Sequence, residues 1–361
     1  MLKDWVILGN GIAALTFLDE FLKKSSSSSS ILQLSSEAMA PSCSLRTTAI
    51  CCVNGIQKGK SSLGDLLFDS YHLAEDFFKK EKPEGVTFGK QFNQCQKEGD
   101  NSPEEYERRF GTVEDLSYLG PFVNKHQTKK GKVWDTYLLD PPAYLSWFEK
   151  RIEKKVSKSS LNFEKRDDFV VNLSVENGLY VLETLNKKII KAKNIVLATG
   201  AYAHLMRALL PTPFEILSKA KVVPGSYLVF DSVDWGEESF VVSYKGHNYV
   251  YRHWDKTLLI GGTTDPNENG AVTAINWVKL KEMFEIGKNE LELPFPAFER
   301  GQAFVGLRQK GVKRTPFWGE IHSVGDAHLF GLLSLYKNGY TFPFKGAKEL
   351  CDQIRKKVPN L

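Results

Sequence analysis

The pattern of apolar and polar residues predicts a strand, a helix and a second strand at the start of the chain. Residues 6–8 form a short apolar run that ends at Gly9, which is typical of a buried parallel strand. From residue 12 to 24 apolar positions recur at helical spacing, and the serine run at 25–30 favours a flexible loop. Residues 31–34 then form a second apolar strand, so the order is a βαβ unit of about 30 residues, as dinucleotide-binding domains require.

Further along, helix and strand patterns alternate. Residues 63–80 predict an amphipathic helix, and Asp140 followed by two prolines predicts the start of a helix that runs to about residue 156. Residues 81–135 are polar and turn-rich, with no clear periodicity. Strands are expected at 169–173, 179–184, 188–190, 195–200, 329–335 and repeatedly between 221 and 264, and helices at 273–288 and 345–357.

This order predicts an α/β fold with a Rossmann-like domain that is interrupted by a mostly antiparallel β-sheet domain. The first, nucleotide-binding domain is expected to comprise residues 1–80, 140–215 and 300–361. The second, substrate domain is expected to comprise residues 81–139 and 216–299.

Composition narrows the class of protein. Of the 361 residues, 42% are hydrophobic and 25% charged, which is ordinary for a globular protein. The net charge of +5 is spread over many charged residues, and the lysine clusters are short, which favours a solvated surface over a nucleic-acid interface. No apolar run is long enough for a membrane span, and the N-terminus lacks a basic leader. The five cysteines are odd in number and lack metal-ligand spacing, so we expect reduced thiols, no metal site and a cytoplasmic protein.

The first turn fits the G-x-G-x-x-A fingerprint of a dinucleotide site. Gly9 would allow a tight turn, Gly11 would let the backbone approach a pyrophosphate, and Ala14 would let helix and strand pack closely. The helix N-terminus at Ile12 and Ala13 would offer free N–H groups to the phosphates. By itself the pattern also fits a chance glycine turn.

The acidic residue expected to bind the adenosine ribose is displaced. Ser35 directly follows the second strand, and the acid, Glu37, comes two residues later. Either side chain could contact the ribose.

Seven further stretches occur in a recognisable order. They read TTAICCVNGIQ, LLDPPAYLSWF, IVLATGAYAH, VVPGSYLVF, YVYRHWDKTLLIGGTTD, GLRQKGVKRTPFWGE and KNGYT. Together with the fingerprint, and over residues 6–354, they resemble the D-amino-acid oxidase superfamily of flavoproteins, which includes glycine oxidase and sarcosine oxidase. The resemblance implies a glutathione-reductase-type fold and bound FAD. Because no cysteine occurs at 306–320, where relatives tether flavin, we expect FAD to be bound non-covalently.

The resemblance also implies which residues contact FAD. Segments 43–53 and 334–341 would face the flavin ring. Besides the fingerprint, the implied contacts are Thr48, Ala49, Val171, Thr199, Gly200, Arg308, Lys337, Asn338, Gly339, Tyr340 and Thr341. One departure stands out, because Ser334-Leu335-Tyr336-Lys337 replaces a turn that is glycine-rich in the family. Lys337 would either be a solvated surface lysine or point at the ring and stabilise negative charge there.

The reaction that the resemblance implies is oxidation of the C–N bond of an amino acid or related amine, by hydride transfer to FAD. Arg308 would bind the substrate carboxylate. Tyr249 and Arg252, on a strand expected to overlie the flavin, are further candidates, with Tyr249 favoured. The partners would be a small amine and oxygen or another electron acceptor. Two alternatives stay open: a flavoprotein that acts on a modified tRNA nucleoside, and a flavin-binding accessory protein without turnover.

Overall fold

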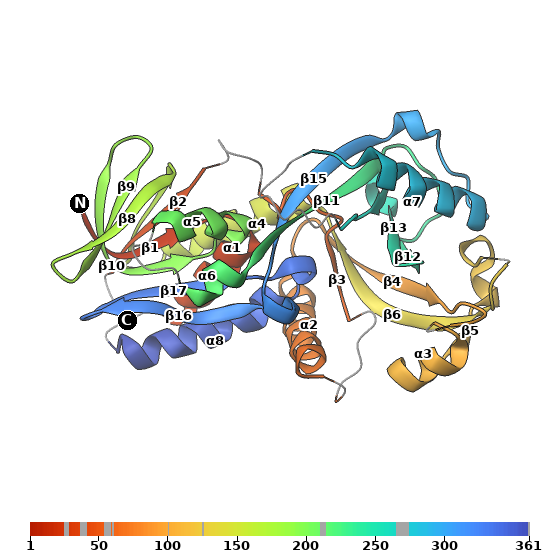
Figure 1. Ribbon diagram of the computed structural model, residues 1–361, viewed down its shortest axis with the longest axis horizontal. Helices are drawn as coiled ribbons and strands as arrows, with labels where there is room; N and C mark the ends of the chain where they lie inside the picture. Colours follow the sequence, from red (N-terminus) through yellow and green to blue (C-terminus); the bar gives the residue numbers. More distant parts are fainter. Residues whose placement is uncertain are drawn as a thin grey trace.

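The protein is described by a computed structural model, in which two sheet-containing halves lie along the long axis (Figure 1). The described residues are 1–24, 29–36, 42–53, 59, 61–99, 101–124, 126–209, 214–264 and 274–359.

The first half is built on an eight-stranded sheet with the path β16-β17-β10-β1-β2-β7, and the β8–β9 hairpin joins it at β10. The strands from β17 to β7 pair in parallel, whereas β16 is antiparallel to β17. Its strands are β1 Leu2–Leu8, β2 Ser30–Ser35, β7 Asn162–Asp167, β8 Val170–Glu176, β9 Leu179–Thr184, β10 Ile189–Leu197, β16 Phe317–Val324 and β17 Ala327–Leu333.

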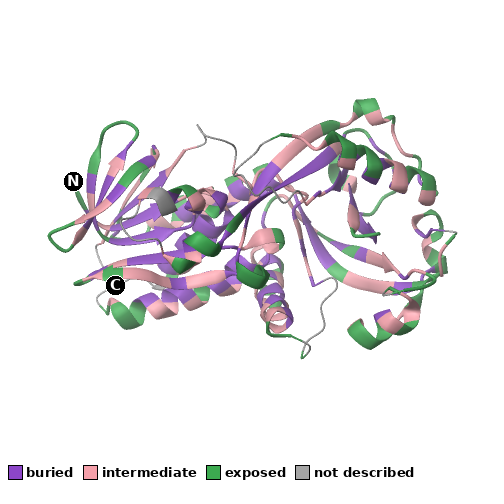
Figure 2. Cartoon of the chain, viewed as in Figure 1, coloured by how far each residue is buried: buried purple, intermediate pink, exposed green. Residues whose placement is uncertain are grey.

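Both faces of this sheet are covered, which explains the unbroken apolar run at its centre. Trp5 and Ile7 pack against helices on one face, and Val6 and Leu8 pack against the β8–β9 hairpin on the other. The helices of the first face are α1 Ile12–Lys24, α2 Ser62–Glu81, α4 Pro141–Val156 and α8 Phe342–Lys357. The two short helices α5 Ala203–Leu209 and α6 Glu215–Lys219 lie beyond the end of β10. Buried positions follow the strands of both halves (Figure 2).

An ion-pair network joins α1 to α4. The Asp19 carboxylate, 3% exposed, contacts Arg151 Nε at 2.8 Å and Lys155 Nζ at 2.5 Å. Burial raises the pKa of Asp19, but its bond to Lys155 and the charges of Lys155, Arg151 and Lys23 outweigh burial and leave the pKa lowered.

The second half is a nine-stranded sheet with the path β15-β11-β14-β13-β12-β4-β6-β3, in which β5 pairs with β6. Helix α7 Trp277–Glu290 covers one face. The strands are β3 Ile50–Cys52, β4 Val86–Gln94, β5 Glu114–Asp115, β6 Lys130–Leu139, β11 Lys221–Phe230, β12 Phe240–Tyr244, β13 His247–Arg252, β14 Thr257–Gly261 and β15 Gln302–Lys310, and helix α3 Pro103–Phe110 lies at the outer end.

Many of the predicted elements match the observed ones, and the differences are of three kinds. The helix expected at 12–24 has those bounds, and the strands of residues 221–264 are present. Residues 81–135, which show no periodicity, contain β4 and most of β6, because these strands pair with each other and with β12 far along the chain. Strands β3, β7, β15 and β16 and the short helices α3, α5 and α6 were not predicted. Strands β3 and β15 fall in ranges expected for the first domain but belong to the second sheet.

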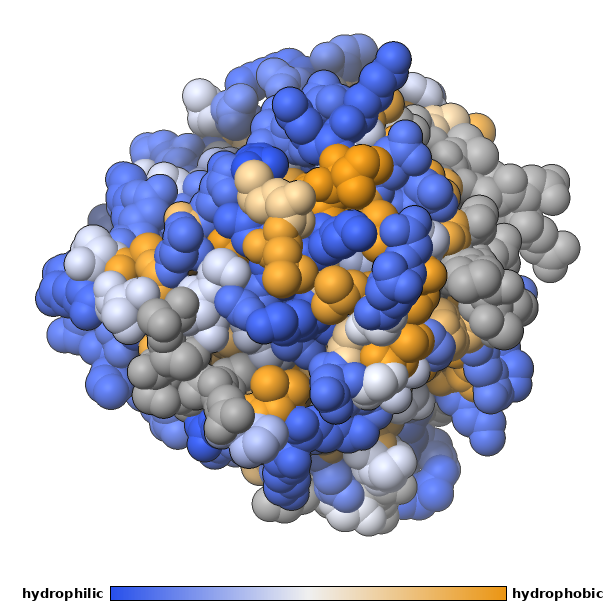
Figure 3. Space-filling view, turned by 90° about the vertical axis from the view of Figure 1, so that its left-hand side faces the viewer, coloured by the Kyte–Doolittle hydropathy of each residue, from blue (hydrophilic) through white to orange (hydrophobic). Residues whose placement is uncertain are grey.

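Apolar side chains at the end of the first sheet are interspersed with hydrophilic ones (Figure 3). The large apolar side chains that are exposed on strands or turns of this sheet include Leu2, Leu185 and Ile189. In the described part of the chain, no helix combines the length and apolarity that crossing a membrane needs.

Candidate active site

A cavity of about 460 Å³ lies where the two sheets meet. Its walls come from the carboxyl ends of β1, β2 and β10, from residues 42–52, from β11, β13 and β15, and from residues 332–340. Ligands of open parallel sheets bind at the carboxyl ends of the strands, so this position is the expected one for a cofactor.

The glycine turn after β1 forms a tight cradle at one end of the cavity. Gly9 has a φ of +120°, and a Cβ there would lie 2.5 Å from the carbonyl oxygen of Ala198. A Cβ on Gly11 would lie 2.8 Å from Ser44 Oγ, which accepts a hydrogen bond from the Ile12 N–H at 3.1 Å. Glycine is therefore required at position 9, and a side chain at position 11 would displace Ser44 Oγ from the Ile12 N–H. The cradle opens onto the N-terminus of α1.

An acidic side chain at this end comes from a strand that was not predicted. Asp168 follows β7, lines the cavity and is 7% exposed. Burial raises its pKa, but hydrogen bonds from Thr184 and from the backbone of Phe169 and Asn186 leave it lowered. Ser35 lines the cavity as well, and Glu37 lies outside the described residues.

The other end of the cavity is the turn that contains the 3₁₀ segment Tyr336–Asn338. Ser334 has a φ of +61° and Tyr336 a φ of +49°. The backbone therefore keeps a left-handed course that suits glycine, although neither residue is glycine. Tyr336 and Lys337 both line the cavity rather than projecting away from it.

The two segments expected to face a flavin ring meet through Tyr340. Its hydroxyl donates a hydrogen bond to the Ser44 carbonyl oxygen at 2.6 Å, across 296 positions in the sequence. Residues 42–44, 46–48, 50 and 52 therefore share one wall with residues 332–340.

Arg308 is held against the wall by backbone carbonyls. Its Nη2 donates to Thr263 O at 2.6 Å and to Pro224 O at 3.1 Å, and its Nε donates to Val223 O at 3.4 Å. A Cβ on Gly225 would lie 2.0 Å from Arg308 Nη2, so glycine is needed where the guanidinium lies. Among the described residues, Arg308 has no carboxylate partner.

Lys337 lies in a cationic environment. Burial of its ammonium group, followed by the positive charges of Arg308, Arg314 and Lys310, lowers the pKa of Lys337 to about 8. A lysine with this pKa is charged for most of the time at neutral pH, but it binds its proton less firmly than a solvated lysine does.

The cavity suits a large polar cofactor. Four residues that line it each have a buried side-chain atom with no hydrogen-bond partner in the described part of the chain: Gln91 Oε1, Thr199 Oγ1, Gln309 Nε2 and Ser334 Oγ. Buried polar atoms are normally hydrogen-bonded, so these four atoms favour a polar ligand. Together with the glycine cradle and the α1 N-terminus, they fit a dinucleotide such as FAD.

Comparison with known proteins defines the family. Residues 4–353 match the family model DAO, FAD dependent oxidoreductase. The chain belongs to this family of FAD-dependent oxidoreductases. FAD is accordingly its cofactor, and the cradle at Gly9 and Gly11 would hold the pyrophosphate. No curated protein sequence matches the chain.

Solved structures show the same fold. A glycine oxidase from Bacillus cereus ATCC 14579 is 14% identical, with a TM-score of 0.74 and 98% of each chain covered. An L-α-glycerophosphate oxidase from Mycoplasma pneumoniae is 16% identical, with a TM-score of 0.77 and coverage of 99% of this chain and 95% of that one. An L-proline dehydrogenase from P. horikoshii is 15% identical, with a TM-score of 0.74 and the same coverage.

In this FAD-dependent oxidoreductase most of the expected cofactor contacts line one cavity. They are Gly9, Gly11, Ile12, Ala13, Ser35, Thr48, Thr199, Gly200, Arg308, Lys337, Asn338, Gly339 and Tyr340. Three others are buried behind the wall. Ala14 packs in the helix–sheet core, Ala49 is 1% exposed, and Thr341 Oγ1 donates to Cys51 Sγ at 3.4 Å.

Val171 was expected to contact FAD, but the neighbouring residue lines the cavity instead. Its side chain is 36% exposed and does not line the cavity, whereas the neighbouring Val170 is buried and does. Successive side chains of a strand face opposite ways, so a shift of one position changes the face.

Tyr249 and Arg252 do not line the cavity, contrary to our expectation. The Tyr249 hydroxyl donates to the Met283 carbonyl oxygen at 2.8 Å, because this face of β13 is covered by α7. Arg252 contacts Asp255 at 2.6 Å and donates to Leu139 O at 3.3 Å. From this strand, Asn248 lines the cavity instead.

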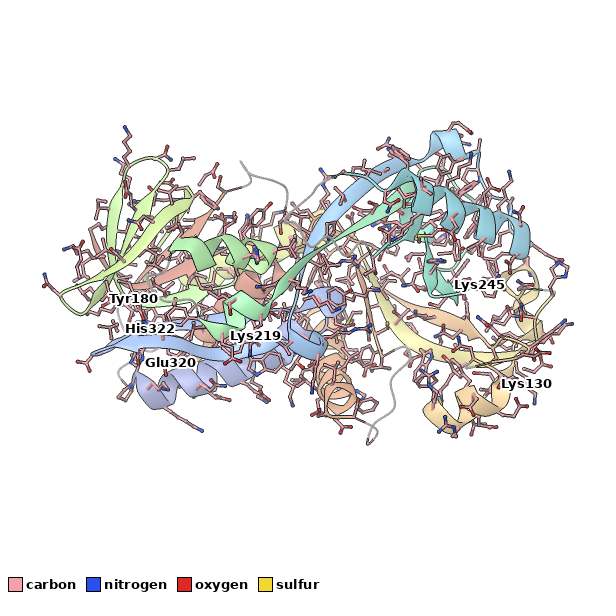
Figure 4. All side chains as sticks on the ribbon, in the orientation of Figure 1. Lys130, Tyr180, Lys219, Lys245, Glu320 and His322 are labelled. Atoms are coloured by element: carbon pink, nitrogen blue, oxygen red, sulfur yellow. The ribbon has the colours of Figure 1, made fainter. Side chains whose placement is uncertain are left out.

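Titratable side chains far from the cavity have structural partners. Tyr180 and His322 lie together at the outer end of the first half, with a distance of 2.9 Å between the Tyr180 hydroxyl and His322 Nδ1 (Figure 4). Lys245 lies in the second half and pairs with Glu290 at 2.6 Å. The described residues also contain no cluster of His, Cys, Asp and Glu that could hold a metal ion.

Proposed function

We propose that this chain oxidises the C–N bond of an amino acid or a related amine by hydride transfer to FAD. The observation that carries the proposal is Arg308, whose guanidinium is fixed by three backbone carbonyls. It lies at the end of the cavity formed by the Tyr336–Asn338 turn, which we call the ring end because the flavin ring is expected there. The carbonyls take the Nε and Nη2 donors, which leaves the two N–H groups of Nη1 to form charge-assisted hydrogen bonds with a substrate carboxylate. The glycine oxidase and L-proline dehydrogenase among its structural neighbours carry names of amino-acid enzymes, which supports this reading.

Bound FAD would accept the hydride that leaves the carbon next to nitrogen. As the C–H bond breaks, the nitrogen lone pair forms a C=N bond, and water then hydrolyses the resulting imine to a carbonyl compound and an amine or ammonia. The nitrogen must be neutral to supply that lone pair. The only acidic side chain among the described residues that line the cavity is Asp168, at the ribose end. The cations at the ring end therefore disfavour a protonated amine and favour the reactive form.

The test begins with an absorbance spectrum of the purified protein and an anaerobic screen of amines for bleaching of the flavin. We expect at least one amino acid or amine with a carboxylate to reduce the flavin. Arg308→Ala should weaken binding of that substrate at least tenfold and affect FAD binding much less. The matched control is Arg355→Ala, which removes an exposed arginine on α8.

Two outcomes would replace the proposal. A yellow protein that no amine reduces would favour an accessory flavoprotein without turnover. A salt-dependent affinity for RNA, with no reaction towards free amines, would favour a role on a tRNA nucleoside.

A further inference from the structure

Three cations lie near the ring of Tyr336, of which Arg308 and Lys337 line the cavity with Tyr336 and Lys310 lies next to its lining. The distances to the Tyr336 ring centroid are 5.5 Å from Arg308 Cζ, 5.8 Å from Lys310 Nζ and 5.9 Å from Lys337 Nζ. We call Arg308, Lys310 and Lys337 the ring-end cations. Arg308 and Lys310 come from β15, whereas Lys337 belongs to the turn before α8.

The ring-end cations have no counter-charge within the described part of the chain, since none of the three forms an ion pair there. The contrast with Arg151 is clear, because that half-buried cation contacts both Asp19 and Glu81. The lowered pKa of Lys337 agrees with burial among like charges. Cation–π contacts give only modest compensation for such crowding.

The backbone of Tyr336 adopts a conformation that costs free energy. Its φ of +49° is unfavourable for a bulky residue, and Ser334 two positions earlier has the same left-handed conformation. A glycine would fit the backbone more easily, but it would not provide the aromatic surface that the three cations share. The position therefore points to binding rather than to folding.

We propose that the substrate carries a second anionic group, a phosphate or a second carboxylate, which Lys310 and Lys337 bind beside Arg308 at the Tyr336 ring. This inference rests on the proposed function, in which Arg308 binds the first carboxylate. A simple amino acid places one carboxylate at Arg308 and leaves two lysines uncompensated. A substrate with a second oxyanion neutralises the cluster, and both lysines can donate hydrogen bonds to it.

The charge of the other walls agrees with this assignment. Arg46 also lines the cavity, with its guanidinium 4.8 Å from the Phe304 ring centroid. The only acidic side chain among the described lining residues, Asp168, is at the opposite end. A substrate with a cationic tail would find no partner near the ring-end cations.

The experiment is isothermal titration calorimetry on the FAD-loaded protein at low salt, with acetate, succinate and glycerol 3-phosphate as probes. We expect succinate or glycerol 3-phosphate to bind at least tenfold more tightly than acetate. Lys310→Met and Lys337→Met should each weaken the dianion about tenfold and acetate less than twofold. Lys348→Met, which removes an exposed lysine on α8, is the matched control and should change neither affinity.

The probes also separate the two sources of a second charge. Tighter binding of glycerol 3-phosphate identifies a phosphate, and tighter binding of succinate identifies a second carboxylate. Equal affinities for acetate and both dianions would overturn the inference, as would lysine variants of unchanged melting temperature that bind the dianions normally. Calorimetric binding needs no turnover, so preferential dianion binding without amine oxidation would refute only the proposed function.

Discussion

Replacement of Gly225 by alanine should displace the Arg308 guanidinium although Arg308 itself is unchanged. The new Cβ would lie 2.0 Å from Arg308 Nη2 and 2.5 Å from Cζ. The guanidinium would have to move about 1.4 Å to reach an ordinary contact of roughly 3.4 Å, and it would lose its bonds to Pro224 O and Thr263 O. A misplacement of about 1 Å in a positioning group can cost about 100-fold in rate, which corresponds to about 2.7 kcal/mol.

The assay is anaerobic flavin reduction by the substrate found in the amine screen, with kcat and KM determined separately. We expect kcat/KM of Gly225→Ala to fall about 100-fold, with unchanged FAD content. The sharper measurement is the double variant with Arg308→Ala. Once the guanidinium is gone, the Thr263 carbonyl oxygen at 2.8 Å is the one of the three nearest atoms that still crowds the Cβ, so Gly225→Ala should add clearly less than its loss as a single substitution.

Two results would refute this reasoning. One is a kcat/KM within about threefold of the unchanged protein, which would mean that the position of the guanidinium does not matter. The other is full additivity of the two substitutions, which would mean that alanine acts through the backbone, where the Thr263 carbonyl oxygen lies 2.8 Å from the new Cβ. A melting temperature for each variant separates either result from loss of folding.

Three further predictions concern the cofactor, the core and pH. Gly9→Ala should abolish FAD retention, because φ is +120° and the Cβ would lie 2.5 Å from Ala198 O; normal FAD content in the purified variant would contradict this. Asp19→Asn should lower the free energy of unfolding in urea by about 3–5 kcal/mol, because it leaves Arg151 and Lys155 without their buried partner. Since the folded pKa of Asp19 is lowered, its contribution is present above the usual pKa of 3.8 and is lost as pH falls below it; a loss under about 1 kcal/mol at pH 7 would count against this. The pKa of Lys337 is about 8 in the folded protein and 10.5 in the unfolded chain, so between these pH values the folded state has lost a proton that the unfolded state keeps. The free energy of unfolding should therefore rise between pH 8 and 10.5, compared with that of Lys337→Met. Parallel pH profiles of the two proteins would show that the pKa of Lys337 is not lowered.

The elements that could be predicted from the sequence are those whose signal is local. The buried run at residues 6–8, the glycine turn and the helix from residue 12 each carry their pattern within a few positions. Strands β4 and β6 could not be found in this way, because they are half exposed and are held by pairing with each other and with β12. The sequence alone does not indicate with which strands these two strands pair.

The same distinction between local and long-range signals applies to the residues of the site. The positions Gly9, Gly11, Thr199 and Arg308 belong to short motifs that can be found in the sequence, and they line the cavity. The face of β13 depends on where α7 lies, so Tyr249 could not be assigned from the alternation of its strand. The convergence of Lys310 and Lys337 depends on the course of a turn whose non-glycine residues adopt positive φ.

The hydrogen bond from Tyr340 to Ser44 has a consequence for synthesis of the protein. Strand β10 has β17 as a neighbour in the sheet, and the wall of the cavity is complete only when Tyr340 reaches Ser44. Until about residue 340 has left the ribosome, the nascent chain exposes an unpaired strand edge and an open cradle. We therefore expect FAD to be captured only after the segment that contains Tyr340 has been made and has folded back onto Ser44.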